Sequence, residues 1–422
     1  MHRVVIFGGA LLVGLFHHGP LPAQVLDKQR VESEAAGQAA EADRLFKRGE
    51  WEPAMAIYRA ERASRAALGD VRYEAYALRA IGVCQAELGD DESAIDSWKE
   101  ARGLDLKRED PGYAGYDDFL IAKGQMRLGR IEDGIASLER CFPLLTQAVD
   151  HDHEADARLV MTRALIEIGE AEAAQSHIAR SIALAGELGD KERLANAWAI
   201  AGQVETSLNH PSLALERFSD AQILFEDQGR AAEAAWMETL VGSTLILLGR
   251  PEPALARFLE AAKLHEHLED GGSLAEDLTA IAGLLLDSGR VGEALETARK
   301  AVDKARDADD REREVEARVR LAQVQGRKGD WKAASEILDE AVGLVRQAFP
   351  NDLPEQVRIL ILTADADRLA GDKERAMGRL DKAGRLADEA GLDPVRQSVD
   401  DARGRLVDKG SAPARTGPEP PR

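Results

Sequence analysis

The chain has 422 residues and a formal net charge of -21, with 31% charged and only 5% aromatic residues. Its mean hydropathy of -0.32 excludes a polytopic membrane protein, and its two cysteines exclude a disulfide scaffold or a four-cysteine zinc site. The negative charge repels phosphate, so nucleic acid is not an expected partner. With 44% hydrophobic residues the chain is expected to fold, and its wealth of Ala, Leu, Glu and Arg favours helices.

Residues 1–23 have the pattern of a secretory signal peptide. Arg3 supplies one positive charge, an apolar run extends from Val4 to Phe16, and a proline-containing stretch ends at Ala23. Cleavage is expected after Ala23, because the apolar run is shorter than the roughly 20 residues that span a bilayer. An uncleaved anchor is the alternative, and it is the one membrane association that we expect. The expected location is the periplasm or the outside of a bacterial cell.

A period of forty residues organises the rest of the chain. One series marks helix ends, where Gly and Asn accept left-handed backbone: Gly49, Gly89, Gly129, Gly169, Asn209, Gly249, Gly289, Gly329 and, two residues late, Gly371. A second series can cap helix N-termini: Asp70, Asp110, Asp150, Asp190, Asp270 and Asp310, with Arg230 and Pro350 in the remaining slots. The two series predict two helices of about 16–18 residues in each repeat.

Small residues stand at matching distances from each turn on both predicted helices. Seven residues before the turn lie Ala42, Gly82, Ala122, Thr162, Gly202, Gly242, Ala282, Ala322 and Ala364. Five residues after it lie Ala54, Ala94, Gly134, Ala174, Ala214, Ala254, Ala294, Ala334 and Ala376. Nine residues after it the residue is usually large, as in Tyr58, Trp98, Phe218 and Phe258. This pattern indicates a close crossing of two antiparallel helices.

The blocks at 81–101, 201–221 and 241–261, with their Leu-Gly, turn Gly, Ala, aromatic and Ala positions, resemble the tetratricopeptide repeat (TPR) in a long, forty-residue form. The resemblance covers about nine repeats. It implies an all-α, right-handed α-solenoid of helix-turn-helix repeats that binds protein or peptide. Glu61 departs from the pattern, since a small residue is expected there. A first repeat that acts as an end cap, with a solvated outer face, would explain it.

The expected boundaries follow from the repeat. Residues 24–391 form the array, with 24–30 as a connector to the first helix. Residues 392–408 form a polar closing helix, and 409–422, with four prolines, form a disordered tail. We expect no separate catalytic domain.

Candidate chemical sites are few. The run from Asp150 to Glu154 offers metal-ligand types, but it reads more simply as a helix N-cap, and His265 and His267 lie on different helix faces. Cys84 and Cys141 are expected as buried core residues rather than a disulfide. No Walker loop, nucleophile elbow or Ser/His/Asp arrangement occurs in the sequence. We therefore expect no catalytic residue, no metal and no cofactor.

The resemblance implies that the first helix of each repeat lines a concave groove, so its inward positions are the candidate binding residues. They are Tyr76, Arg79, Tyr116, Phe119, Lys123, Arg163, Asn196, Gln203 and Trp236, while later repeats place Glu276, Glu316 and Asp365 at inward positions. Amides, aromatic rings and cations of this kind suit an extended peptide. The alternative is that the aromatic residues pack locally and that the arginines pair with nearby carboxylates.

The sequence thus predicts a non-catalytic interaction scaffold or adaptor of the bacterial cell envelope, which binds peptide or protein partners through the groove. The alternative is a regulatory TPR protein that senses a ligand or a peptide.

Overall fold

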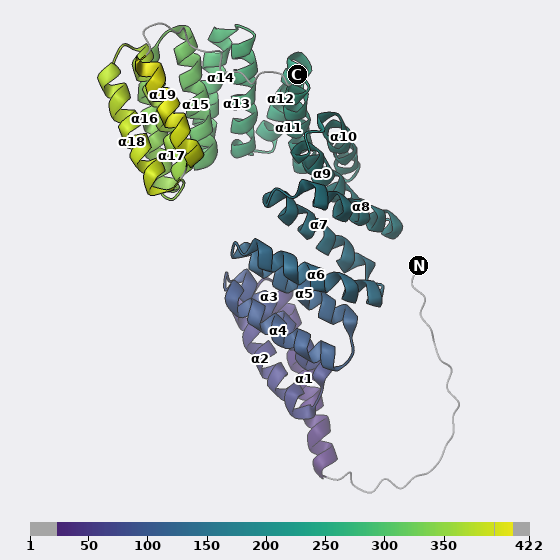
Figure 1. The fold of residues 1–422 in the computed structure, drawn as a ribbon. Coiled ribbons are helices and arrows are strands. Elements are labelled where there is room, and N and C mark those ends of the chain that lie inside the picture. Colours follow the sequence, from purple (N-terminus) through teal and green to yellow (C-terminus); the bar gives the residue numbers. More distant parts are fainter. Residues whose placement is uncertain (1–22, 392, 408–422) are drawn as a thin grey trace. The chain divides into compact units, whose positions relative to one another are not determined.

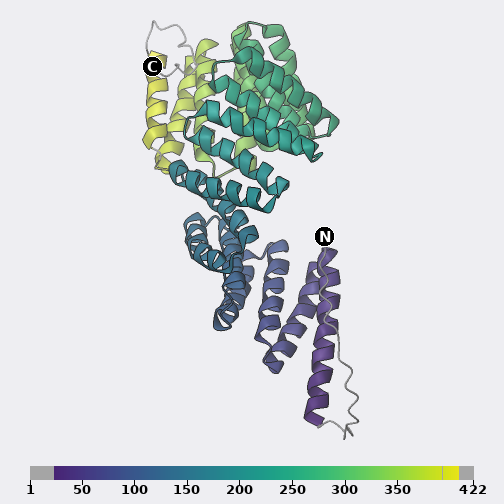
Figure 2. The same ribbon diagram turned by 90° about the vertical axis from the view of Figure 1, so that its right-hand side faces the viewer.

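The structure is a computed structural model that describes residues 23–391 and 393–407. Secondary structure in these residues consists of nineteen helices, which follow one another as hairpins joined by short turns (Figure 1). The chain divides into two compact units, Met1–Leu188 and Gly189–Arg422. Figure 2 shows the stacked helices of each unit from a second direction.

Unit 1 holds the first four repeats. Its helices are α1 (Ala23–Lys47), α2 (Trp51–Leu68), α3 (Val71–Glu87), α4 (Asp91–Lys107), α5 (Pro111–Arg127), α6 (Ile131–Ala148), α7 (His151–Glu167) and α8 (Ala171–Leu188). Residues 24–30, expected as a connector, instead belong to α1. The expected signal peptide lies outside the described residues except for its last position.

Unit 2 holds five repeats and a final helix. Its helices are α9 (Lys191–Ser207), α10 (Pro211–Asp227), α11 (Ala231–Leu247), α12 (Pro251–His267), α13 (Gly271–Asp287), α14 (Val291–Asp307), α15 (Arg311–Lys328), α16 (Trp331–Ala348), α17 (Leu353–Leu369), α18 (Lys373–Glu389) and α19 (Asp393–Val407). Helix α19 falls in the segment expected to close the array. The expected tail lies outside the described residues.

Both forty-residue series, the one at helix ends and the one at helix N-termini, act as their residue types predict. Asn209 has a φ of 58°, in the same left-handed region as the glycines of its series. The six aspartates of the second series each accept a hydrogen bond from the backbone N–H three residues ahead, at 2.9 to 3.4 Å. Where an aspartate of this series precedes a helix, its cap therefore sets that boundary locally.

The small residues permit the expected close crossing of the two helices in a repeat. A Cβ added at Gly82 would lie 2.4 Å from Nε1 of Trp98, and one at Gly202 would lie 2.4 Å from the ring of Phe218. A Cβ on Gly134 would approach the carbonyl oxygen of Ala122 to 3.2 Å. The glycine seven residues before a turn thus makes room for the aromatic ring nine residues after it.

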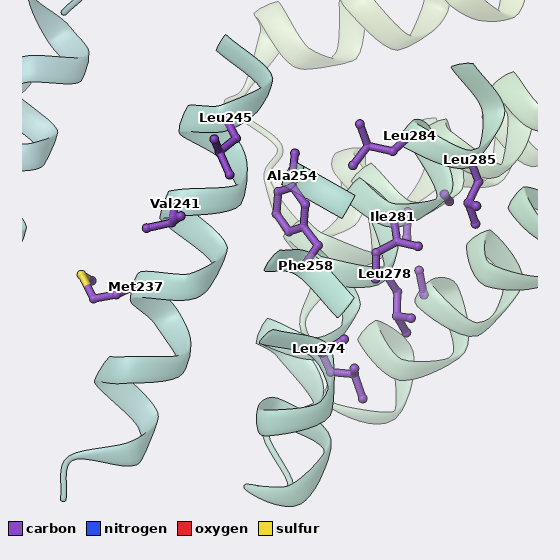
Figure 3. Close-up of a cluster of buried hydrophobic side chains, with 14 of the residues drawn as sticks. Met237, Val241, Leu245, Ala254, Phe258, Leu274, Leu278, Ile281, Leu284 and Leu285 are labelled. Carbon is purple, nitrogen blue, oxygen red and sulfur yellow. The ribbon is translucent and has the colours of Figure 1, made fainter. Parts of the chain in front are cut away.

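Repeats are joined by aromatic and aliphatic side chains that reach into the next hairpin. In unit 2, Phe258 of α12 belongs to one buried cluster with Leu245 of α11 and with Leu278 and Ile281 of α13 (Figure 3). Each second helix therefore supplies core both to its own repeat and to the following one, as expected for a solenoid.

The expectation of a solvated Glu61 is wrong. Its side chain is fully buried on α2, with the Arg65 guanidinium 3.5 Å away, because α3 packs against α2 at this point. Burial raises the pKa of Glu61. The first repeat therefore carries an ionisable group in its interior.

Across residues 23–391 and 393–407, no helix combines the length and apolar character needed to cross a membrane.

Candidate functional site

The candidate binding residues of unit 1 differ in accessibility. Tyr76, Lys123 and Arg163 have exposed side chains, whereas Arg79 is only 8% exposed. Phe119 is buried, and Tyr116 is half-buried with its ring centroid 4.2 Å from that of His153. The alternative interpretation, in which these side chains pack or pair locally, therefore holds for Arg79, Tyr116 and Phe119.

Unit 2 holds the remaining three candidate residues. Gln203 is exposed, Asn196 is half-buried, and Trp236 is half-buried and packs against the core of the unit.

Two of the expected residues line a cavity of about 220 Å³ in unit 1. Its walls come from α3, from the end of α4 and from the first turn of α5, so it lies at the junction of the second and third repeats. The lining residues are Arg72, Tyr73, Tyr76, Arg79, Asp105, Arg108 and Tyr113. We call this cavity the tyrosine–arginine pocket.

The buried guanidinium of Arg79 forms the floor of the tyrosine–arginine pocket. Its Nε lies 2.6 Å from Oδ1 of Asp117, and its Nη2 lies 3.1 Å from Oδ2 of the same carboxylate and 2.5 Å from Oδ2 of Asp105. Both carboxylates are fully buried. Burial raises the pKa of Asp117 to about 7, although Arg79 opposes this shift. The floor is therefore a fixed polar network between repeats.

Asp105, the one carboxylate that lines the pocket, is engaged on both oxygens. Oδ2 accepts from Arg79, and Oδ1 lies 2.8 Å from Nε of Arg108. With only 1% of its surface exposed, Asp105 presents almost no acceptor to a ligand.

Three tyrosines form the rim of the pocket. Tyr73 and Tyr113 are each 44% exposed and Tyr76 is 39% exposed. The Arg79 guanidinium lies 4.7 Å from the ring centroid of Tyr113, and that of Arg108 lies 5.7 Å from it. The Tyr76 hydroxyl donates to Asp43 at 2.9 Å, and burial raises its pKa to about 12. The rings are thus held in place while their outer faces remain accessible.

The polar groups of the pocket that have no hydrogen-bond partner within the described residues can donate hydrogen bonds. Arg72 is exposed and makes no ion pair with any described residue, and its guanidinium lies 5.8 Å from the ring centroid of Tyr73. The hydroxyls of Tyr73 and Tyr113 make no hydrogen bond within residues 23–391 and 393–407. A ligand that supplies acceptors, a carboxylate above all, matches this arrangement.

Sequence reasoning found Tyr76 and Arg79 but missed Arg72, Tyr73, Asp105, Arg108 and Tyr113. A signal existed, because Tyr73 and Tyr113 stand forty residues apart, three residues after the capping aspartate of successive repeats. The side chains at the ends of helices, beside the turns, contribute as much as those at mid-helix.

In the part of the chain that the structure describes, the other candidate sites, the run from Asp150 to Glu154, the two histidines of α12 and the two cysteines, show no grouping of the kind that a chemical site needs. Asp150 caps α7 and lies 2.7 Å from Nδ1 of His153, and within the described residues no three potential ligands are grouped to hold a metal ion. His265 is buried with Nδ1 2.7 Å from Oδ2 of Asp277, whereas His267 is exposed. The two cysteines are buried and free, as expected.

Comparison with known proteins shows the fold. No family model and no curated protein sequence matches the chain. The apo form of RapI is similar in structure, with a TM-score of 0.64 and 13% identity over 88% of this chain and 98% of that one. The apo form of the quorum sensor NprR from B. thuringiensis has a TM-score of 0.58 and 13% identity, over 84% of this chain and 99% of NprR.

A third similar structure is a signal-transduction ATPase from Pyrococcus horikoshii, described as having a tetratricopeptide repeat sensor. Its TM-score is 0.55 and its identity 17%, and the match covers 82% of this chain and 55% of the ATPase. The chain thus spans about half the length of that protein. Together these likenesses confirm the expected fold, an all-α array of TPR type.

Proposed function

From the TPR-type fold and the tyrosine–arginine pocket, we propose that this protein is a non-catalytic scaffold or adaptor that binds a peptide or an extended segment of a protein partner. The observation that carries the proposal is the pocket's imbalance of polar groups. Its one carboxylate is buried and ion-paired with two arginines, while an exposed guanidinium and two phenolic hydroxyls are free to donate.

The pocket favours a ligand with a carboxylate next to an apolar or aromatic side chain. The carboxylate would accept from Arg72 and from the hydroxyls of Tyr73 and Tyr113, and the neighbouring side chain would lie against the exposed tyrosine rings. A peptide C-terminus or an acidic side chain meets this description. Ordered rings and a fixed floor reduce the entropy lost on binding.

A location in the bacterial cell envelope completes the proposal. It rests on the signal-peptide pattern of residues 1–23. Export predicts that the mature protein begins at Gln24, which N-terminal sequencing of protein recovered from the periplasm would test. Full-length protein confined to the cytosol would contradict the location and leave the binding proposal standing.

A peptide-sensing regulator is the second candidate, and it is favoured by the descriptions of two similar structures as a quorum sensor and a tetratricopeptide repeat sensor. A sensor should become more compact when its peptide binds, whereas a scaffold should keep its dimensions. Small-angle X-ray scattering with and without a bound peptide separates the two.

A display library of random heptapeptides with free C-termini tests binding directly. Selection on the wild-type protein should enrich peptides that carry a carboxylate beside an apolar residue. Synthetic copies in which all carboxylates are converted to amides should bind at least tenfold more weakly. Failure to enrich any sequence, or equal binding of the amidated peptides, would refute the proposal.

A further inference from the structure

A second cavity, in unit 2, has the opposite character. It measures about 600 Å³, within the range of roughly 300–1,000 Å³ that is usual for ligand sites. It lies between the eighth and ninth repeats, bounded by the first turns of α15, the end of α16 and the start of α17. We call it the acidic pocket.

The acidic pocket exists where the repeat is interrupted. Elsewhere in unit 2 three residues separate the second helix of one repeat from the first helix of the next, as between α14 and α15. Between α16 and α17 there are four, 349–352, and α16 is also one residue longer than α14. The insertion explains why Gly371 is two residues late, and it leaves Phe349 with 38% of its surface exposed beside the cavity.

The floor of the acidic pocket is apolar. Val315 of α15 and Val345 of α16 are only 3% and 1% exposed, and Phe349 flanks them. A ligand that enters can therefore bury a hydrocarbon stem against these side chains.

The rim of the acidic pocket carries four carboxylates and one guanidinium. Arg358 already forms an ion pair with Glu355, since its Nε lies 2.6 Å from Oε2 and its Nη2 lies 2.5 Å from Oε1 of that residue. Asp352 caps α17 by accepting from the N–H of Glu355 at 3.0 Å. Glu312 and Glu316, four residues apart on one face of α15, make no ion pair with any described residue.

Neither of these two carboxylates on α15 forms a close ion pair, although the charges of Arg313 and Arg358 act on Glu316 and oppose the rise in its pKa. Burial, followed by the charges of Glu276 and Glu312, raises the pKa of Glu316, so a cation placed between the two carboxylates would relieve both costs. A bare metal ion fits less well, because the described residues offer no set of three ligands grouped for one.

We propose that the acidic pocket binds an organic cation with an apolar stem, namely the side chain of an arginine or lysine in a peptide. The ammonium or guanidinium group would lie between Glu312 and Glu316, and the methylenes would pack on Val315, Val345 and Phe349. This site is independent of the tyrosine–arginine pocket, and neither proposal requires the other.

The test uses the full chain and N-acetyl-L-arginine methylamide as the probe, observed by saturation-transfer NMR. The matched neutral probe is N-acetyl-L-citrulline methylamide, which has nearly the same shape. The arginine probe should bind at least fivefold more tightly than the citrulline probe, and the difference should shrink between about 20 and 300 mM salt.

Variants then locate the site. The double substitution Glu312→Gln with Glu316→Gln should weaken the arginine probe at least fivefold, whereas Glu296→Gln, an exposed glutamate of α14 outside the cavity, should leave its affinity unchanged. The wild-type comparison of arginine with citrulline holds even if the double variant folds poorly. Equal binding of the two probes, or an unchanged affinity in the folded double variant, would overturn the proposal. Arg72→Glu should not affect this probe, so the two pockets are tested separately.

Discussion

At the scale of single residues, the repeat places different polar groups at equivalent positions. Arg79, Asp105 and Asp117 form the buried network of the second junction, and Thr239, His265 and Asp277 stand 160 residues further on in each case. In that second network, Asp277 accepts from Thr239 Oγ1 and lies beside His265 Nδ1, both at 2.7 Å. Equivalent positions of the repeat can thus hold a buried polar junction, and the residue types decide its chemistry.

Asp117 should make stability depend on pH. Burial raises its pKa to about 7, so the folded state retains a proton that the unfolded chain releases near pH 4. The contribution of Asp117 to the free energy of unfolding is therefore present below pH 4 and is lost as pH rises towards 7. The melting temperature of the wild type, minus that of Asp117→Asn, should fall from pH 4 to pH 8. A difference that is constant, or that rises with pH, would show that folding does not raise the pKa of Asp117.

Gly82 should be intolerant of a methyl group. A Cβ there would meet the buried indole of Trp98, whose Nε1 donates to the carbonyl of Arg79 at 3.2 Å. Gly82→Ala should lower the free energy of unfolding by about 1–3 kcal/mol, because overpacking outweighs the gain in helix propensity. Gly103→Ala is the control, since no atom lies within 4 Å of the added Cβ, and it should stabilise by up to about 1 kcal/mol. Urea unfolding of both variants measures the contrast, and similar effects in the two would refute this packing.

At the scale of the helices, turn residues and, at the first helix of most repeats, capping aspartates mark the boundaries. The sequence predicted the turns because Gly, Asn and Asp report backbone geometry and capping directly. It did not predict that 24–30 belong to α1, since these residues precede the first turn of the repeat pattern, nor that Glu61 is buried, since burial depends on the neighbouring helix.

Capping should be measurable one helix at a time. Asp270, at the N-terminus of α13, accepts from the N–H of Ser273 at 3.0 Å. Arg250, at the N-terminus of α12, makes no side-chain cap. Asp270→Ala should cost about 0.5–2 kcal/mol in urea unfolding, and Arg250→Ala should cost almost nothing. Equal losses in the two variants would show that Asp270 does not act as a cap.

At the scale of the whole molecule, the repeat explains the fold almost completely and the candidate site only in part. Spacing predicted paired helices and small crossing residues, and the resemblance to the TPR pointed to Tyr76 and Arg79 as candidate binding residues. The tyrosine–arginine pocket also needs Asp105 and Arg108 from the end of α4 and Tyr113 from α5. Those residues meet only after two repeats pack, so a single-repeat pattern does not reveal them.

Net charge should also act on the molecule as a whole. The chain has 76 acidic and 55 basic residues. Added salt screens both the repulsion among the excess carboxylates and the attraction within surface ion pairs, and the relief of repulsion should be the larger effect. The melting temperature should rise between about 20 and 300 mM NaCl, measured by circular dichroism. A fall would indicate that surface ion pairs dominate.

The affinity of a library-selected peptide for three forms of the protein tests the central claim most directly. Isothermal titration calorimetry would compare the wild type, Arg72→Glu and Arg59→Glu, the last making the same charge change at an exposed arginine of α2 outside the pocket. We predict that Arg72→Glu raises Kd at least tenfold while Arg59→Glu changes it less than threefold. Equal Kd values for the two variants would contradict binding at the tyrosine–arginine pocket.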